Sequence, residues 1–346
     1  MHAATAPVLL TAGDPAGIGP EITLQACLQQ ADWARDAVIV GHLPSLQRAA
    51  QVLQLAQPIP FQTVDLTHLA GPAPAGVLRV HPVAGDTDVA HMAWGQVSPA
   101  GGRIAAQSVQ TAAQACLERC ASAMVTAPIH KQALDLAGVP FPGHTEMLQH
   151  ACATHQGVSV HDLPVRMMLV NSSLRVVLVS IHISLHEAIR ALTPEQLLTT
   201  LRITHRAESR FLGRPPRIGV AGLNPHAGEG GLMGREELDI IAPALDLARA
   251  EGLDVSGPHA PDTVFMRARR TPTQAGEFDV VVAMYHDQGL IPIKYLGLDD
   301  GVNVTLGLPL LRTSPDHGTA FDLAGTGRAS PASMIAAWRL ARELAG

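Results

Sequence analysis

Three histidines stand at the ends of apolar runs that have the composition of buried strands. The histidines are His182, His226 and His286, and the runs are 174–181, 218–223 and 280–285. Ligands of α/β proteins usually bind beyond the carboxyl ends of strands, and three imidazoles with open positions suit a catalytic divalent metal ion. The chain has 17 histidines, so a structural or surface role is the alternative for each one taken alone. Three at strand ends together favour a metal site.

Two aspartates could support the histidines. Asp287 adjoins His286, and Asp262 lies in the segment 257–263. Either carboxylate could orient a ligand imidazole by accepting its N–H, or take part in proton transfer. The competing interpretation of Asp262 is a helix N-cap.

Other polar residues suit the binding of a small anion. Lys294, Asn303 and Arg312 fall close to strand ends in the last quarter of the chain. Lys and Arg there would neutralise a phosphate or carboxylate, although each charge taken singly is more often a solvated surface group. His144 and Thr145 belong to a segment, GHTE, that has the form of a helix start.

Three glycine-containing segments have weaker or more general meanings. Segments 13–21 and 228–234 fit neither the dinucleotide-binding nor the P-loop pattern. A glycine-rich turn that opens a helix can receive an anion on its backbone N–H groups; the alternative is a tight turn without a ligand. The run HGTAFDLAGTG (317–327) is too rich in small residues for a core helix, and we interpret it as a loop wrapped closely around something.

The elements that must position these residues alternate between short apolar runs and longer Ala/Leu-rich amphipathic runs. This alternation predicts a mainly parallel α/β architecture. The turn 171–173 predicts one antiparallel hairpin, and loops are expected at 70–76, 83–102 and 266–276. Strands are expected at 8–11, 37–41, 123–126, 165–170, 174–181, 218–223, 280–285 and 302–306. Helix N-caps before proline are expected at Ser98, Thr193 and Ser330.

Composition limits the class of protein. A chain of 346 residues predicts two domains, and 47% hydrophobic with only 3% aromatic residues predicts a core of Ala, Val, Leu and Ile. A net charge of −6 argues against a nucleic acid as the main partner. Cys116 and Cys120 are expected on one helix face as small buried hydrophobes. We find no signal peptide or membrane-spanning run, so we expect a cytoplasmic protein.

The motifs resemble the 4-hydroxythreonine-4-phosphate dehydrogenase family of bacterial vitamin B6 synthesis. The matching segments, besides the strand that ends in His182, are GDPAGIGPE (13–21), TAPIHK (126–131), GHTE (143–146), GLNPHAGEGG (222–231), PDT (261–263), MYHDQGL (284–290), GVNVTLGLP (301–309) and RTSPDHGTAFDLAG (312–325). They span nearly the whole chain in the family's order. Ser180, Ile181 and the stretch 266–276 depart from the commonest pattern, but neither departure removes a proposed ligand.

The resemblance implies the fold of isocitrate and isopropylmalate dehydrogenases, with two α/β/α domains, a central cleft and a homodimer. Residues 1–140 with 298–346 would form the nucleotide-side domain, and 141–297 the domain for metal, substrate and dimerisation. NAD or NADP would bind without a Rossmann fingerprint, at His317, Gly318, Thr319, Ala320 and Asp322.

The resemblance also assigns the other site residues. His182, His226 and His286 would hold one divalent metal ion per site (zinc, magnesium or cobalt), with His182 coming from the opposite subunit. The substrate would contact His144, Thr145, Lys294, Asn303 and Arg312. Lys294 or Asp262 would handle the proton, and the sequence does not choose between them.

The implied reaction is oxidation and decarboxylation of 4-phosphohydroxy-L-threonine to 3-amino-2-oxopropyl phosphate, in the synthesis of pyridoxal 5'-phosphate. The main alternative is a related dehydrogenase of another substrate, such as a four-carbon sugar-acid phosphate or an aromatic cis-diol. A phosphate acyltransferase of related fold needs neither metal nor nicotinamide, so the histidines speak against it. A non-catalytic metal-binding protein would not need the HGTAFDLAG segment.

Overall fold

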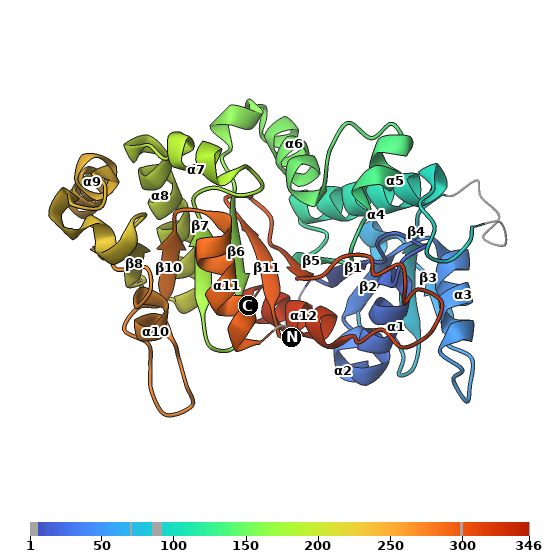
Figure 1. Ribbon diagram of the computed structural model, residues 1–346. Coiled ribbons are helices and arrows are strands. Elements are labelled where there is room, and N and C mark those ends of the chain that lie inside the picture. The colour runs from blue at the N-terminus through green and yellow to red at the C-terminus, as the bar shows by residue number, and fades with distance from the viewer. Residues whose placement is uncertain (1–5, 70, 85–91, 298–299, 346) are drawn as a thin grey trace. The chain divides into compact units, whose positions relative to one another are not determined.

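The computed structural model describes all residues except 1–5, 70, 85–91, 298–299 and 346 (Figure 1). Parts of the expected loops 70–76 and 83–102 therefore lie outside the described residues. The chain forms two compact units: unit 1 is Met1–Leu163 with Leu308–Gly346, and unit 2 is Pro164–Gly307. Both units combine strands and helices, as the α/β prediction required.

The described residues of unit 1 form six parallel strands in the order β3-β4-β2-β1-β5-β12. Their bounds are β1 Val8–Thr11, β2 Ala37–Gly41, β3 Phe61–Thr63, β4 Leu78–Pro82, β5 Ala123–Thr126 and β12 Arg312–Pro315. Its α-helices are α1 Gly19–Gln29, α2 Ala31–Ala34, α3 Leu43–Val52, α4 Pro99–Leu117, α5 Lys131–Leu136, α6 His144–Gln156 and α12 Ala332–Ala345. Two short 3-10 turns, Leu66–His68 and Val160–Asp162, complete it.

Apart from residues 298–299, which are not described, unit 2 forms six strands in the order β11-β6-β7-β10-β8-β9, and their pairing is mixed. The strands β7, β10, β8 and β9 are parallel, whereas β6 is antiparallel to both of its neighbours. The strands are β6 Arg166–Val170, β7 Arg175–Leu178, β8 Ile218–Ala221, β9 Val255–His259, β10 Val280–Ala283 and β11 Val302–Leu306. The helices are α7 Leu185–Ala191, α8 Pro194–Leu212, η4 Pro225–Gly231, the π-helix η5 Glu237–Ile241, α9 Ala242–Ala250, α10 Val264–Ala268 and α11 His286–Leu296.

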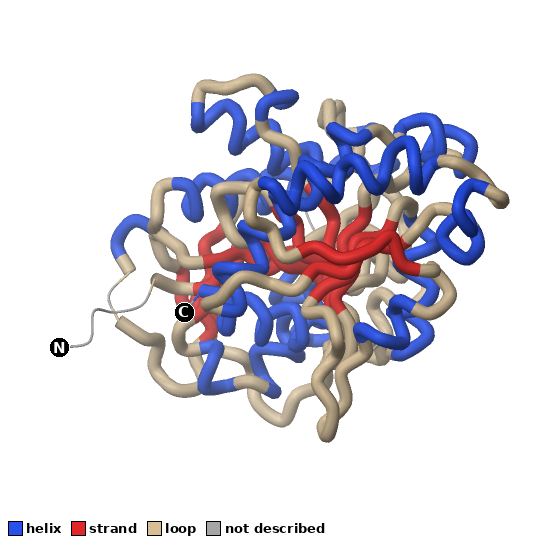
Figure 2. Tube along the Cα trace, turned by 90° about the vertical axis from the view of Figure 1, so that its left-hand side faces the viewer, coloured by secondary structure: helices blue, strands red, loops and turns tan. Residues whose placement is uncertain are grey.

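Helices cover both sides of the strands, as Figure 2 shows. The central strands are therefore buried on both faces, which explains why they are apolar almost throughout. Leu9, Val38 and Met124 are fully buried in unit 1, and Val176 and Val281 in unit 2. Burial of each such side chain contributes about 1.5–3 kcal/mol, so aliphatic residues can build the core with few aromatic ones.

The local predictions were confirmed at the strongest signals. Four of the expected strands, β1, β2, β5 and β11, have the expected bounds. The 171–173 turn joins β6 to β7 in an antiparallel hairpin. The Asn171 side chain stabilises the turn by accepting hydrogen bonds from the backbone N–H groups of Ser173 and Leu174. Ser98 caps α4 and Thr193 caps α8 with their hydroxyl oxygens.

Several local predictions were wrong. Strands β3, β4, β9 and β12 were not expected, and β7, β8 and β10 end two or three residues earlier than expected because the chain there turns toward the polar segments. The expected loops contain the first turn of α4 and the end of α10. Cys120 lies beyond the end of α4, so it does not share a helix face with Cys116. No helix in the described ranges has the length and hydropathy to cross a membrane.

Candidate active site

Three neighbouring parallel strands of unit 2 carry the three histidines at one edge. The strand order is β7-β10-β8, and His182, His286 and His226 follow these strands within five residues of their ends. Because parallel strands end at the same edge of a sheet, the three loops emerge together. This is the arrangement that the apolar runs predicted.

Two of the three imidazoles come together in one chain. The ring centroids of His182 and His286 lie 5.6 Å apart, and both residues line a cavity of about 250 Å³ with Ser180 and Tyr285. His226 lines a different cavity. Over the part of the chain that the structure describes, no three His, Cys, Asp or Glu side chains are grouped closely enough to hold one metal ion.

The His286 ring is held by its neighbours. Its Nδ1 lies 2.7 Å from a carboxylate oxygen of Asp287, so a ring with Nδ1 as donor presents Nε2 to a ligand, which is the arrangement that orients metal-bound histidines. Gln288 accepts from the backbone N–H of Met284 and donates to the carbonyl of Gly222, each at 2.7 Å. Gly289 lets α11 approach β7, since a Cβ there would come within 2.5 Å of Leu178.

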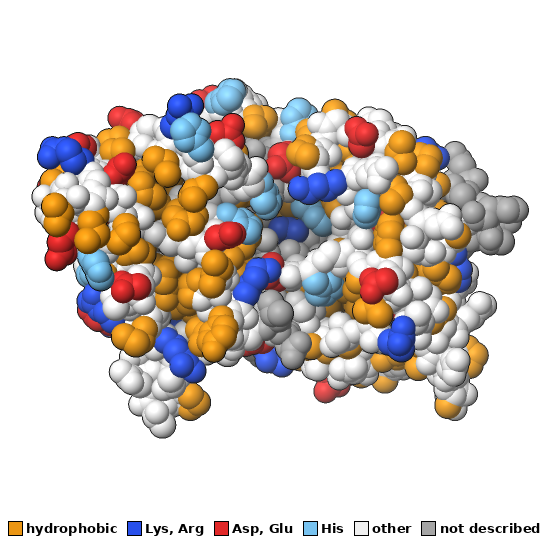
Figure 3. All heavy atoms as spheres, viewed as in Figure 1, with side chains coloured by type: hydrophobic (Ala, Val, Ile, Leu, Met, Phe, Trp, Pro, Cys, Tyr) orange, Lys and Arg blue, Asp and Glu red, His pale blue; other side chains and the backbone are white. Residues whose placement is uncertain are grey.

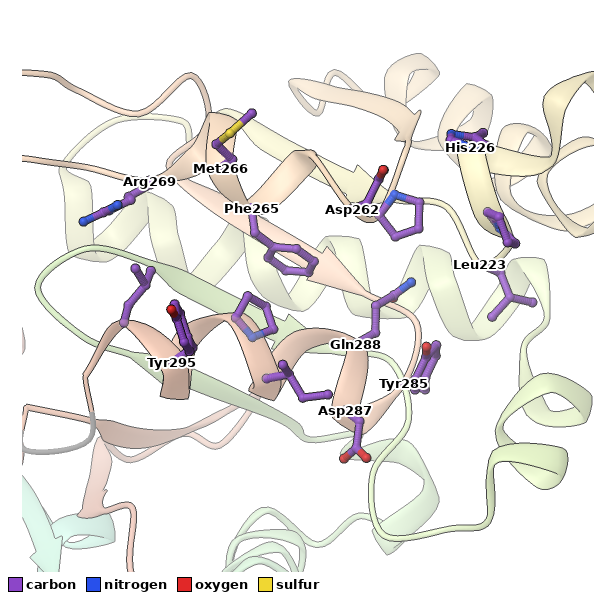
Figure 4. Close-up of a pocket in the computed structure, with 15 residues that line it drawn as sticks. Leu223, His226, Asp262, Phe265, Met266, Arg269, Tyr285, Asp287, Gln288 and Tyr295 are labelled. Carbon is purple, nitrogen blue, oxygen red and sulfur yellow. The ribbon is translucent and has the colours of Figure 1, made fainter.

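His226 lies on an exposed loop with an unusual backbone. Five consecutive residues, from 226 to 230, have positive φ angles between 46° and 79°, a left-handed conformation that non-glycine residues rarely adopt. His226 and Asp262 line a cavity of about 780 Å³, and Gln288, Phe265 and Tyr295 line the same cavity (Figure 4). The loop therefore presents His226 at the cavity wall.

The N-cap interpretation of Asp262 is wrong. Helix α10 begins at Val264, and its N-cap residue is Thr263 without a side-chain cap bond. Asp262 instead lies at the surface of the large cavity. A carboxylate in this place is available for proton transfer or for a ligand.

Lys294 and Asn303 belong to the same unit as the histidines. Lys294 lies on α11, two turns after His286, and Asn303 lies on β11 opposite Leu169. Both side chains are partly buried. The sequence-predicted polar residues of unit 2 thus come from α11, from β11 and from the loops after β7, β8 and β10.

Unit 1 builds a second polar group around Arg312, at the start of β12. Nε and Nη2 of Arg312 both donate to the hydroxyl of Thr126, at 3.0 and 2.8 Å. Burial lowers the pKa of the Arg312 guanidinium to about 10, but the group stays cationic near neutral pH. A buried cation close to a helix start suits an anion.

His144 stands beside this guanidinium, at the first position of α6. Burial holds the pKa of the His144 imidazole well below its usual value, and the charge of Arg312 lowers it further. The ring is therefore neutral, and its Nε2 has no hydrogen-bond partner among the described residues. Thr145 follows in the same first turn, so a neutral imidazole and a hydroxyl accompany the cation.

The loop 317–327 wraps around segment 13–21. The backbone N–H of Ile18 donates to the carbonyl of Thr319 at 3.0 Å, and Glu21 accepts from the N–H groups of Gly325 and Gly327 at 2.6 and 2.8 Å. His130 stacks on Phe321 with ring centroids 4.8 Å apart. Since residues 11–20 are all buried, this first glycine segment is a tight packing turn and not an open anion cradle.

The five residues expected to touch a nucleotide share this loop. The residues are His317, Gly318, Thr319, Ala320 and Asp322. His317, Gly318 and Asp322 are exposed, whereas Thr319 is buried against Gly17, where an added Cβ would come within 3.0 Å. The exposed members form the side of the loop that a ligand can reach.

Sequence reasoning missed the residues that hold these loops. Glu21, Glu237 and Gln288 bind backbone groups of the loops that carry the candidate residues. Glu21 and Glu237 are almost fully buried. The available signal was an acidic residue next to an apolar helix segment, which is also common on solvated surfaces.

One family model and relatives of nearly the same length match this chain. The model of the family "Pyridoxal phosphate biosynthetic protein PdxA" matches residues 33–341. The 4-hydroxythreonine-4-phosphate dehydrogenase of Beijerinckia indica is 47% identical over 339 residues, covering 98% of this chain and 95% of that protein. The D-threonate 4-phosphate dehydrogenase of Salmonella typhimurium is 41% identical and covers 99% of both chains.

A solved structure has the same fold. The crystal structure of the 4-hydroxythreonine-4-phosphate dehydrogenase of Klebsiella pneumoniae superposes with a TM-score of 0.87 and 40% identity, covering 99% of this chain and 100% of that chain. The likeness covers nearly the whole length of both chains.

Proposed function

The chain belongs to the PdxA family of pyridoxal phosphate biosynthetic proteins, and we propose that it oxidises and decarboxylates 4-phosphohydroxy-L-threonine to 3-amino-2-oxopropyl phosphate. Its relatives are named as dehydrogenases, so the chain is an oxidoreductase, and we propose that the group it oxidises is a secondary alcohol. We further propose a nicotinamide acceptor, NAD or NADP, one divalent metal ion per site (zinc, magnesium or cobalt) and a cytoplasmic location. The observation that carries the proposal is the emergence of three histidine loops at the carboxyl ends of β7, β10 and β8.

The donor set of this edge fits the proposed ion. Imidazole nitrogens suit zinc, cobalt and related divalent metals, and the Asp287 carboxylate orients the His286 ring for such a role. When bound, the metal ion would polarise the reacting hydroxyl, and the nicotinamide would accept the hydride. His182, His226 and His286 are the residues proposed to hold the ion.

The chain's own residues would bind the rest of the substrate. Arg312 supplies a buried positive charge for a phosphate or carboxylate, and neutral His144 supplies a free ring nitrogen beside it. Thr145, Lys294 and Asn303 are proposed as further substrate contacts. Asp262 and Lys294 are the two candidates to hold and move the proton.

We propose that the active site is shared between two subunits. In support, a single described chain groups no three metal-binding side chains. The helix faces near His226 also expose large apolar residues: Met266 is 71%, Ile291 66% and Tyr295 91% exposed. On the viewed face, Figure 3 shows hydrophobic side chains gathered over unit 2. Such a patch suits a second copy of the chain.

Two histidines are candidates for the ligand that one subunit supplies to the metal site of the other. The family resemblance assigns it to His182, whereas the pairing of His182 with His286 in one chain favours His226. Mixed dimers of inactive variants test both. Mixing His182→Ala with His226→Ala leaves one intact site in either case, so activity should recover as subunits exchange. Mixing His226→Ala with His286→Ala restores activity only if His226 crosses, and mixing His182→Ala with His286→Ala only if His182 crosses.

The decisive test of the activity is turnover of purified 4-phosphohydroxy-L-threonine, followed by NADH or NADPH absorbance, before and after treatment with a chelator. We expect activity that the chelator removes and a divalent metal restores. Chelator-resistant activity would contradict the metal, and absence of turnover in the metal-loaded protein would contradict the substrate.

A second substrate has a specific observation in its favour. The Salmonella typhimurium relative that is 41% identical is named for D-threonate 4-phosphate. That acid carries a phosphate and a carboxylate, so the Arg312 group would suit it equally. Comparing kcat/KM for the two phosphorylated substrates in one assay decides between them, and an aromatic cis-diol in the same assay tests the unphosphorylated alternative.

A further inference from the structure

The loop that carries His226 has a backbone that needs support. His226, Ala227 and Glu229 have φ angles of 52°, 55° and 46°, and side chains with a Cβ disfavour this left-handed region. Two glycines alternate with them at positions 228 and 230. A run of this kind does not hold itself in place, so its position must come from contacts with the rest of unit 2.

Those contacts converge on one buried carboxylate, that of Glu237. One oxygen of Glu237 accepts from the backbone N–H groups of Leu223 and Asn224, each at 2.7 Å. The other oxygen accepts from the side-chain amide of Asn224 at 2.9 Å. Glu237 is the first residue of η5 and is only 3% exposed. The carboxylate therefore fixes the chain directly before Pro225 and His226.

Glycines make room for this carboxylate. A Cβ on Gly228 would lie 2.7 Å from one oxygen of Glu237, and a Cβ on Gly222 would lie 3.0 Å from the other. The loop thus closes around the acid from both ends. Three N–H groups of the loop therefore donate to this one side chain.

We infer that Glu237 is a positioning residue, which sets the place of His226 for metal binding without touching the ion. This inference rests on the metal role proposed for His226. Residues behind the ligands of a metal site typically change metal affinity about 10- to 100-fold when they are replaced. Gln288 supplies a comparable tie on the other side, because it links Gly222 to the backbone of Met284 near His286.

The test uses Glu237→Gln in the full-length protein, with Glu236→Gln as the matched control. Glu236 contacts only the Asn224 side chain among the hydrogen bonds of this loop, at 2.6 Å. Each protein is freed of metal, titrated with Co²⁺ and followed by the cobalt absorption spectrum and by calorimetry. Thermal unfolding and nucleotide binding in the same samples report whether the fold is intact.

We expect Glu237→Gln to weaken cobalt binding about 10- to 100-fold, with nucleotide binding unchanged and Glu236→Gln close to wild type. Restoring the carboxylate on a shorter stem, in Glu237→Asp, should recover part of the affinity. A purely structural role would lower the unfolding temperature of Glu237→Gln but leave the cobalt affinity of the folded protein unchanged, and that result would overturn the inference.

His226→Ala separates this failure from failure of the proposed function. If His226→Ala loses cobalt binding while Glu237→Gln keeps it, only the positioning role is wrong. If His226→Ala binds cobalt as well as wild type, the metal assignment is wrong and the inference falls with it. Should Glu237→Gln not fold, Asn224→Ala removes the side-chain amide that donates to both Glu237 and Glu236. It is expected to weaken cobalt binding about two- to tenfold, whereas the Glu236→Gln control should stay close to wild type. Unchanged affinity in Asn224→Ala would likewise overturn the inference.

Discussion

The two units place loops at the ends of three adjacent parallel strands, but they use those loops differently. In unit 1 the loops after β1, β5 and β12 pack on one another, with the first glycine segment fully buried. In unit 2 the loops after β7, β10 and β8 present histidines, and the glycine loop around His226 is exposed and left-handed. The same topological position therefore serves packing in one unit and presents candidate ligands in the other.

A buried glutamate holds the loop in each case. Glu21 accepts two backbone N–H groups from loop 317–327, and Glu237 accepts two from the chain before His226. What differs is the space around the glycines. In segment 13–21 a Cβ on Gly13 or Gly19 would come within 2.4 Å of a backbone carbonyl oxygen, whereas a Cβ on Gly230 would meet nothing within 4 Å. Glycine-rich sequence alone does not distinguish these situations, whereas burial does.

The largest effect should follow from His226→Ala. If His226 on the exposed loop of unit 2 holds the metal ion, turnover should fall by about 10³-fold or more, because metal ions contribute several kcal/mol to transition-state stabilisation. Since His226 is exposed, its loss should change the unfolding temperature by no more than about 2 °C. Substrate-dependent NADH formation and a thermal melt on one sample measure both. Normal turnover of His226→Ala in metal-free buffer would show that the exposed loop of unit 2 does not supply a metal ligand, and the proposed difference between the two units would be wrong.

Arg312→Ala tests whether unit 1, despite its packed loops, still supplies substrate binding. Loss of a charge-assisted contact should weaken binding of the phosphorylated substrate by about 1.5–3 kcal/mol, or roughly 10- to 150-fold in KM. Arg312→Lys keeps the charge but not the fork that binds Thr126, so it should fall in between. Unchanged kinetics in the alanine variant would remove Arg312 from the site.

Two alanine substitutions compare the glycine loops directly. At Gly19 a Cβ would lie 2.3 Å from the carbonyl oxygen of Ala12, and overpacking of about 3 kcal/mol outweighs a gain in helix propensity of about 1 kcal/mol. At Gly230 a Cβ meets nothing within 4 Å, but φ is +68°, which costs about 1 kcal/mol. Denaturant unfolding should therefore show a net loss of about 2 kcal/mol for Gly19→Ala and about half that for Gly230→Ala. Equal losses would mean that the two loops are packed alike.

The sequence predicted the elements whose pattern is set by burial. Segments such as VLLT (8–11) are apolar throughout because helices cover both faces, and they appear as β1 with the expected bounds. Strand β12, RTSP, was missed because its side chains are polar yet buried, with Arg312 bonded to Thr126. Strand β9 contains Gly257 and Pro258, which argue against a central strand, and it indeed lies at an end of the strand order.

The sequence could predict where the histidine loops emerge from the sheet, but not how their side chains are arranged. Strand ends and histidines are local features, so the three histidine loops could be predicted to emerge together. The pairing of His182 with His286 depends on the strand order β7-β10-β8, and hydrophobic patterns do not encode that order. Glu21 and Glu237 escaped notice because their function depends on tertiary contacts with backbone more than a dozen residues away.

The smallest effect concerns pH and again separates buried from exposed groups. Burial and Arg312 hold the pKa of His144 well below the usual histidine value of 6.5, so in the folded chain the ring is neutral, while in the unfolded chain it gains a proton near 6.5. Between those two pKa values the unfolded state binds more protons, and stability must rise with pH, by up to about 1.4 kcal/mol per pH unit. The contribution is complete above 6.5 and is lost as the pH falls toward the folded pKa.

The pKa values of His42 and His259 are also lowered by burial, but both remain in a His144→Gln variant, so the difference between the two proteins isolates His144. The free energy of unfolding, measured from pH 7.5 down to pH 5, should fall less steeply in His144→Gln than in the unsubstituted protein. Identical slopes would show that the ring is accessible to solvent protons, and that the polar group of unit 1 is as open as the histidine loops of unit 2.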